Sequence, residues 1–180
     1  MKTITRHSLT LLLLCAILLG GFAVPASADS NVDAIKQYIT SHYSSRYEGP
    51  SYVERDLLQE GYGLNDVQKA IETCGFDWDA RAVRAANYAC QVVKGGASAL
   101  GIAKILCSIG YTSQQTRYAL EHCDIDWNYQ AWRDAHTLVE KRGTNVSEEK
   151  VREFLLKLGY SEDQAKYGCT YRLHNSPGKE

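Results

Sequence analysis

The chain has 180 residues, 23% of them charged and 44% hydrophobic, and its formal net charge is −1 at pH 7. Acidic and basic residues are mixed along the sequence, which excludes the basic stripe typical of a nucleic-acid-binding protein. Three prolines, twelve tyrosines and frequent helix-forming residues are typical of a folded helical protein and exclude a disordered one.

Residues 1–28 predict a secretory signal peptide. Lys2 and Arg6 precede an apolar run over residues 9–24, and residues 25–28 end the segment as Pro-Ala-Ser-Ala. A basic start, a short apolar run and an Ala-x-Ala site predict export and cleavage after Ala28. The run is too short for a membrane-spanning helix, and we expect no transmembrane segment in the mature chain.

Apolar residues at helical spacing predict nine helices in the mature chain. Their expected bounds are 32–45, 51–60, 64–74, 79–93, 98–108, 113–122, 128–141, 147–158 and 162–171. The last residues, 176–180, contain Pro177 and Gly178 and are expected to form a frayed tail.

A Gly-Tyr pair recurs at a fixed interval of 49 residues. The pairs are Gly61-Tyr62, Gly110-Tyr111 and Gly159-Tyr160, each preceded by a Leu-rich helix and followed by a second helix. The glycine suits the left-handed position that ends a helix, and we expect the tyrosine to pack under the turn. Thr112 with Gln115, and Ser161 with Gln164, predict capping boxes at the start of the following helix.

An Asp-Trp motif recurs with the same interval in the first two copies. Asp77-Trp78 and Asp126-Trp127 each lead into an Ala-rich helix. We interpret each Asp as a helix N-cap and each Trp as a side chain buried between neighbouring units.

These intervals predict an all-α protein of three tandem 49-residue three-helix units, packed as a compact array of helix-turn-helix-like repeats. The units are residues 29–77, 78–126 and 127–175. The first unit is irregular, because Asp56 and Glu60 stand where the later copies have Ile or Phe, and Ile or Leu. Either a one-residue deletion near Gln59 shifts the register, or this helix is less buried.

Five cysteines remain after the signal peptide, and they are Cys74, Cys90, Cys107, Cys123 and Cys169. They lack a C-x-x-C motif and a His at ligand spacing, so we expect no metal site and no cofactor. The third helix of the second unit is expected to end close to Cys90. In an oxidising compartment we therefore predict a Cys90–Cys123 disulfide. An odd number of cysteines leaves at least one thiol free.

Two acidic clusters are candidates for binding a basic partner. They comprise Asp77 and Asp79 in one, and Glu121, Asp124 and Asp126 in the other, although solvated helix caps are the simpler explanation of both. The histidines are spread over different helices without a triad-like order, so we expect no catalytic site and a non-enzymatic protein.

The chain resembles the host cell surface-exposed lipoprotein (Ltp) family. The resemblance lies in residues 110–120, Gly-Tyr-Thr-Ser-Gln-Gln-Thr-Arg-Tyr-Ala-Leu, in residues 126–128, Asp-Trp-Asn, and again in residues 159–167. It covers essentially the whole mature chain. Family members often carry a lipidated Cys directly after the signal, whereas Cys15 here lies inside the apolar run.

The resemblance implies a bacterial envelope protein made of helical repeats. It also implies superinfection exclusion, in which a prophage-encoded member blocks DNA injection by related phages by engaging their tape measure protein. We therefore expect an exported protein that acts by protein–protein contact. The alternatives are a secreted or wall-associated interaction or adhesion module, and a secreted hydrolase with converging His and acid. The Gly-Tyr turn also resembles that of the ubiquitin-associated fold, in topology only.

Overall fold

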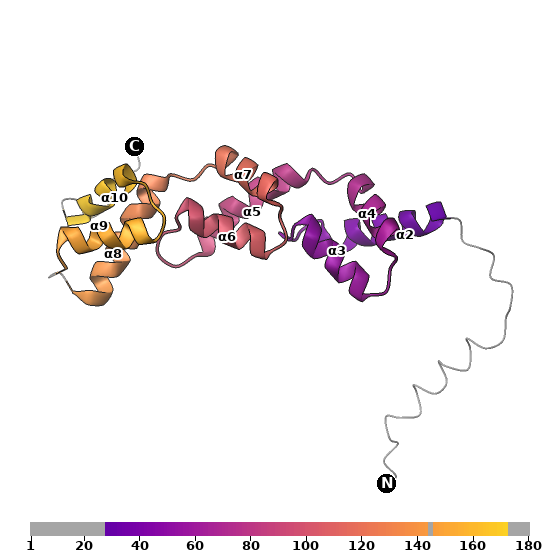
Figure 1. Cartoon of the computed structure of the whole chain (residues 1–180), viewed down its shortest axis with the longest axis horizontal. Coiled ribbons are helices and arrows are strands. Elements are labelled where there is room, and N and C mark those ends of the chain that lie inside the picture. Colours follow the sequence, from indigo (N-terminus) through magenta and orange to yellow (C-terminus); the bar gives the residue numbers. More distant parts are fainter. Residues whose placement is uncertain (1–27, 144–145, 173–180) are drawn as a thin grey trace, which may run out of the picture.

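Three groups of three helices form an elongated row (Figure 1). The computed structural model describes residues 28–143 and 146–172, and every regular element in these residues is a helix. The all-α prediction is therefore confirmed for the described chain. The predicted signal peptide, apart from Ala28, and the predicted tail over residues 176–180 lie outside the described residues.

The helix bounds agree closely with the periodicity of the sequence. The helices are α2 (Ala28–Tyr43), α3 (Pro50–Gln59), α4 (Leu64–Thr73), α5 (Trp78–Val92), α6 (Ala99–Ser108), α7 (Ser113–His122), α8 (Trp127–Arg142), α9 (Glu148–Lys157) and α10 (Glu162–Gly168), followed by the 3₁₀ helix η2 (Cys169–Arg172). The largest difference is at α2, which begins a turn earlier than predicted because apolar spacing marks only the buried turns. Over these residues, no helix combines the length and apolarity needed to cross a membrane.

Side-chain caps fix where most helices begin. The carboxylates of Asp77 and Asp126 accept hydrogen bonds from the backbone N–H groups of Ala80 and Tyr129, both at 2.9 Å. Capping boxes are present at the starts of α7 and α10, as the sequence predicts. Each cap satisfies backbone donors that an uncapped helix start leaves open.

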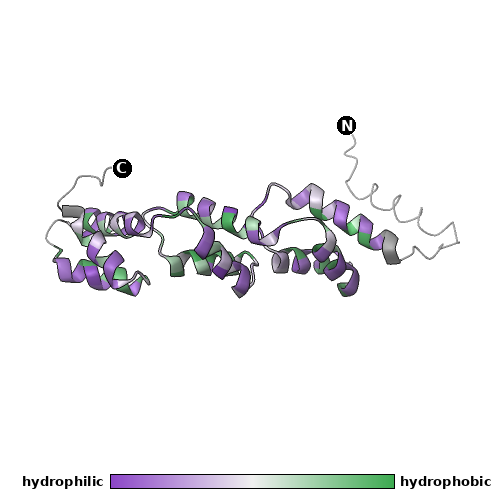
Figure 2. Cartoon of the chain, turned by 90° about the horizontal axis from the view of Figure 1, so that it is seen from above, coloured by the Kyte–Doolittle hydropathy of each residue, from purple (hydrophilic) through white to green (hydrophobic). Residues whose placement is uncertain are grey.

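The buried side chains form three separate clusters, one in each group of three helices. The first is centred on Ile39, the second on Ile102 and the third on Leu155, each fully buried. Hydrophobic and hydrophilic residues accordingly alternate along the helices of each group in Figure 2. Each group therefore has its own small core instead of sharing one that runs the length of the molecule.

The Gly-Tyr pairs close the second helix of each group. Gly61, Gly110 and Gly159 have φ values of 93°, 95° and 91°. The N–H group of each following Tyr donates to the carbonyl five residues earlier, on Leu57, Leu106 or Leu155, at 3.1–3.2 Å. This is a Schellman turn, which needs a residue in the left-handed conformation, and glycine adopts it without strain.

The tyrosines of these turns differ in burial. Tyr111 and Tyr160 are 4% exposed, as expected for side chains packed under the turn, whereas Tyr62 is 37% exposed. The expected burial is therefore wrong for Tyr62. Its turn lies at the outer end of the row, where no described group precedes it (Figure 1).

The irregular α3 keeps its register. Its buried residues Val53 and Leu57 stand 49 residues before Ile102 and Leu106 of α6, so the suggested deletion near Gln59 is wrong. Asp56 is accommodated because the Tyr43 hydroxyl donates a hydrogen bond to its carboxylate. Burial and this contact raise the pKa of Tyr43.

Neighbouring groups meet through backbone atoms at the glycine turns. The N–H of Gly49 donates to the carbonyl of Ile109 at 2.7 Å, and the N–H of Ser51 donates to the carbonyl of Gly110 at 3.0 Å. A Cβ at Gly110 would lie 2.4 Å from the backbone nitrogen of Tyr52. The absence of a side chain at Gly110 therefore permits this approach.

A buried arginine joins the first two groups. The guanidinium of Arg81, at the start of α5, donates to the carbonyl of Tyr43, the last residue of α2, and to those of Ser44 and Arg46 beyond it. It also lies 4.2 Å from the ring centroid of Phe76. The cation thus satisfies carbonyls that the helix end leaves open.

We expect Gly110→Ala to destabilise the protein more than Gly61→Ala. Both substitutions place alanine at positive φ, which costs about 1–2 kcal/mol. Only the Cβ at position 110 would also meet another group, whereas nothing lies within 4 Å of a Cβ at position 61. Such overpacking adds about 1–3 kcal/mol. Urea unfolding measures both, and equal losses would contradict the close approach at Gly110.

Alkaline pH should destabilise the protein through Tyr111. Burial raises the pKa of its hydroxyl from 10.0 to about 12, although Arg81 and Arg84 act in the opposite direction. Because the folded-state pKa is higher, this stabilisation is complete below pH 10 and is lost as the pH rises towards 12. Urea unfolding across this range should show a weaker pH dependence for Tyr111→Phe, with the exposed Tyr62→Phe as control. An unchanged dependence in Tyr111→Phe would contradict this role.

Candidate interaction surface

The five predicted acidic residues lie in two separate connections. Asp77 and Asp79 begin α5, and Glu121, Asp124 and Asp126 follow one another from α7 into α8. Figure 1 shows that these connections belong to different parts of the row. Asp77 and Asp126 are occupied as N-caps, so the carboxylates with no capping role are Asp79, Glu121 and Asp124.

The connection between α7 and α8 combines these acids with an exposed aromatic ring. Tyr118 is 39% exposed, and its ring stacks on His122 with 3.9 Å between centroids. The Nδ1 of His122 donates a hydrogen bond of 2.8 Å to the carbonyl of Tyr118, and this bond holds the imidazole in place. Glu121 and Asp124 are exposed beside this pair in sequence. We call Tyr118, Glu121, His122, Asp124 and Asp126 the acidic aromatic surface.

The backbone of this surface is anchored to the neighbouring helix. The N–H of Asp124 donates to Oδ1 of Asn87 on α5 at 3.1 Å. Cys123 and Ile125 alternate with the acids and pack against the core of the second group. The acidic side chains therefore point outward from a connection whose backbone is held in place. Arg117 is the single Lys or Arg in α7, so few basic residues lie near them in this helix. Sequence analysis found the acids but not the aromatic pair beside them.

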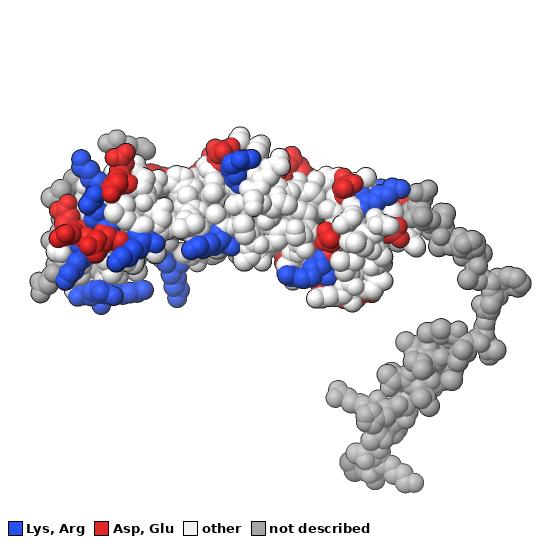
Figure 3. Space-filling view, in the orientation of Figure 1, with Lys and Arg blue, Asp and Glu red and all other residues white. Residues whose placement is uncertain are grey.

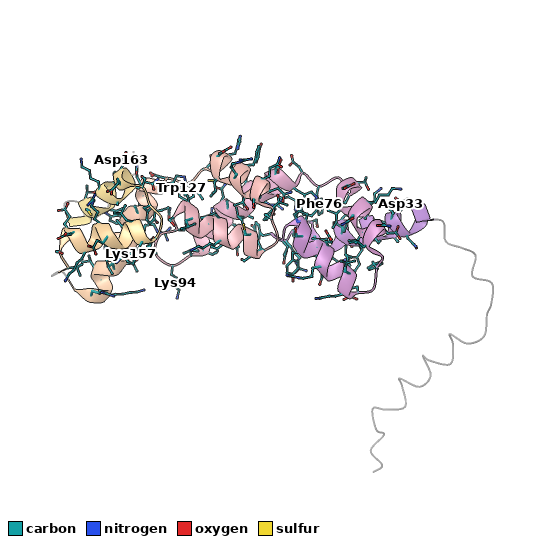
Figure 4. The ribbon with its side chains drawn as sticks, in the orientation of Figure 1. Asp33, Phe76, Lys94, Trp127, Lys157 and Asp163 are labelled. Atoms are coloured by element: carbon teal, nitrogen blue, oxygen red, sulfur yellow. The ribbon has the colours of Figure 1, made fainter. Side chains whose placement is uncertain are left out.

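A second surface, a groove of about 430 Å³, lies between α8 and α9. Its lining is apolar at Leu138, Val146 and Phe154 and charged at Arg142, Lys150, Glu153 and Lys157. Lys and Arg gather on this part of the molecule in Figure 3, and Figure 4 labels Lys157 on α9. We call it the terminal groove. Sequence reasoning missed it because its residues come from two helices and only the fold brings them together.

The histidines do not converge. His42 stacks on Tyr38 in α2, His122 on Tyr118 in α7, and His136 lies 5.2 Å from the Trp132 ring in α8. His174 lies outside the described residues. Within the described ranges, no three residues among His, Cys, Asp and Glu are grouped so that they could hold a metal ion.

The motif tryptophans link each group to the next. Trp78 is half-buried against the first core, and its Nε1 donates to the carbonyl of Ile71 at 3.3 Å. Trp127 is half-buried against the second core. Each Trp is the first residue of the first helix in one group, and its side chain packs on the core of the group before it. The role of the two tryptophans is therefore structural.

Cys90 and Cys123 are free thiols, so the Cys90–Cys123 bridge is not formed in the structure. The two thiols nevertheless belong to one environment, since Cys90 is part of the second core and Cys123 packs against it. Burial raises the pKa of both thiols, and each thiolate would also repel the other.

Comparison with known proteins finds no match. No protein-family model matches the sequence, and no similar protein was found among curated sequences or solved structures.

The thiols should differ in reactivity in the reduced protein. Cys107 is exposed, whereas Cys90 is 7% exposed and its raised pKa lowers its thiolate fraction. We expect native alkylation at pH 8 to label Cys107 about an order of magnitude faster than Cys90. After oxidation, Cys90 and Cys123 should appear in one disulfide-linked peptide. Mass mapping measures both, and equal labelling or a bridge to Cys107 would contradict this arrangement.

Proposed function

We propose that this is an exported bacterial protein that acts by protein–protein contact at the cell surface. The observation that carries the proposal is the acidic aromatic surface, because exposed tyrosine beside carboxylates suits a basic protein segment. Tyrosine contributes contact area with little loss of conformational entropy, and the carboxylates attract cations during encounter. The predicted signal peptide over residues 1–28 supplies the route of export.

We further propose that the three helix groups are copies of one 49-residue unit. In support, α3, α6 and α9 begin at residues 50, 99 and 148, and α4, α7 and α10 at residues 64, 113 and 162. Trp78 and Trp127 begin α5 and α8 at the same interval. Repeated units that stack in a row provide extended binding surfaces, and their exposed residues can differ while the cores stay alike.

The biological role proposed is exclusion of superinfecting phages, by contact with the phage tape measure protein during DNA injection. The support is the resemblance of residues 110–120, 126–128 and 159–167 to the Ltp pattern, together with the acidic aromatic surface. A secreted adhesion module would use the same surface for another basic ligand, and a pull-down from envelope extracts distinguishes the two.

Cells expressing the protein should resist injection by related phages, and the variant Tyr118→Ala/Glu121→Lys should lose that resistance. Removing the ring and reversing one charge should weaken a contact at this surface about tenfold or more. Plating efficiency over a phage panel and uptake of phage DNA measure the effect. Unchanged plating with the wild-type protein would reject phage exclusion.

Glu72→Lys is the matched control for this experiment. Glu72 is exposed on α4 and stands 49 residues before Glu121, so it changes charge at the corresponding place of another group. We expect it to retain full resistance. Equal loss in the control and the variant would show that overall charge matters and that the acidic aromatic surface does not.

A further inference from the structure

The contact between neighbouring helix groups is built twice from equivalent residues. The N–H of Gly49 donates to the carbonyl of Ile109, and the Ser98 hydroxyl, 49 residues on, donates to the carbonyl of Leu158. In both contacts the start of a second helix meets the Gly-Tyr turn of the following group. Gly110 lies against Tyr52 in the first, and Gly159 lies against Leu100 in the second.

The corresponding turn of the first group lacks such a neighbour among the described residues. Tyr62 is 37% exposed, against 4% for Tyr111 and Tyr160, and a Cβ at Gly61 would meet nothing within 4 Å. Leu58 and Leu64 beside it are 38% and 48% exposed. We call Leu58, Glu60, Gly61, Tyr62 and Leu64 the open turn.

The opposite end of the row carries the complementary half of the contact. A smaller hollow between the second and third groups is lined by Val93, Ala97, Gly101, Lys104 and Ile105 of the second group and, from the third group, by Leu158 among others. Residues 49 positions later, Arg142, Val146, Lys150, Glu153 and Phe154, line the terminal groove. The terminal groove is therefore the same hollow, and its described lining comes from α8, α9 and the connection between them alone.

The residues at the two ends of the row differ in charge from their equivalents at the internal contact, and the two differences are of opposite sign. Inside the row, Leu158 lines the same hollow as Val93 and Gly101, and none of the three is charged. At the ends, the residue equivalent to Leu158 is Glu60, and those equivalent to Val93 and Gly101 are Arg142 and Lys150, all exposed. Uncharged lining residues are thus replaced at these equivalent positions by residues of opposite charge, which would attract each other across such a junction.

We propose that the open turn of one copy docks into the terminal groove of a second copy, so that chains associate head to tail. The two faces lie at opposite ends of the row in Figure 1, so one copy cannot satisfy both by itself. A heterologous contact of this kind extends into a linear assembly or closes into a ring. Exposed charge pairs are weak and screened by salt, so the assembly forms reversibly and dissociates as ionic strength rises. This association requires no other protein and is independent of the proposed phage partner.

Charge reversal tests the contact. The full chain is expressed with its leader, purified, and its N-terminus determined by mass spectrometry. Sedimentation velocity over a range of protein and salt concentrations should show association at low salt. Glu60→Lys alone, and Arg142→Glu/Lys150→Glu alone, should each raise the midpoint concentration about tenfold. Combining all three substitutions should restore association, because the charges are then opposite again.

Glu72→Lys on α4 makes the same charge change as Glu60→Lys, and Lys166→Glu on α10 makes half the charge change of Arg142→Glu/Lys150→Glu. Both residues are exposed, and both variants should associate like the wild type. Circular dichroism and unfolding midpoints confirm that every variant is folded. A monomer at all concentrations would overturn the proposal, as would association that the end variants leave unchanged. A symmetric dimer lost only on Glu60→Lys would also overturn it, because that outcome uses one face twice.

Discussion

The left-handed glycine of the Gly-Tyr turn is the constraint on which the rest of the structure depends. It ends the second helix of each group and lets the following Tyr bond back to the last turn of that helix. At Gly110 it also leaves space for the backbone of the preceding group, where any Cβ would collide with Tyr52. One residue type thus controls both the hairpin within a group and the spacing between groups.

The small cores follow from this arrangement. In α5 the buried positions Ala82, Ala85, Ala86 and Ala89 allow close approach of the helices, and the corresponding positions of α8 include Ala131 and Ala135. Each core receives partly buried aromatic side chains from the connections, such as Trp78 and Trp127. Between the first two groups, backbone hydrogen bonds from Gly49 and Ser51 and the buried Arg81 join neighbouring segments. Stability in such a row is the sum of local units and nearest-neighbour contacts.

We propose two kinds of surface for contact with proteins. The acidic aromatic surface lies where α7 connects to α8, and the open turn and terminal groove lie at the ends of the row (Figure 1). Because these surfaces do not share residues, binding of a basic partner and association between copies need not compete. A row of joined copies would present the acidic aromatic surface repeatedly, which raises the effective concentration of binding sites for an extended partner.

The sequence by itself determined the helices, their caps and the glycine turns, because these depend on contacts between residues close together in the chain. Apolar spacing located the helices, and the capping boxes at Thr112 and Ser161 appeared as predicted. The sequence also identified Glu121, Asp124 and Asp126 as candidates for binding. It offered both acidic clusters as candidate sites for a basic partner, whereas the structure places the two clusters in separate connections. The suggested deletion near Gln59 is wrong because Val53 and Leu57 are buried in register with Ile102 and Leu106, while Tyr43 donates a hydrogen bond to Asp56.

Only the tertiary structure decided which equivalent residues are covered. Tyr62 and Tyr111 occupy the same place in the same turn, yet their exposure differs because a neighbouring group covers one of them. The terminal groove likewise depends on how α8 and α9 pack, and no local pattern joins Arg142 to Lys150. Burial and charge pairing between distant segments are properties of the packed chain, so a repeat pattern predicts its units but not the surfaces left open at its ends.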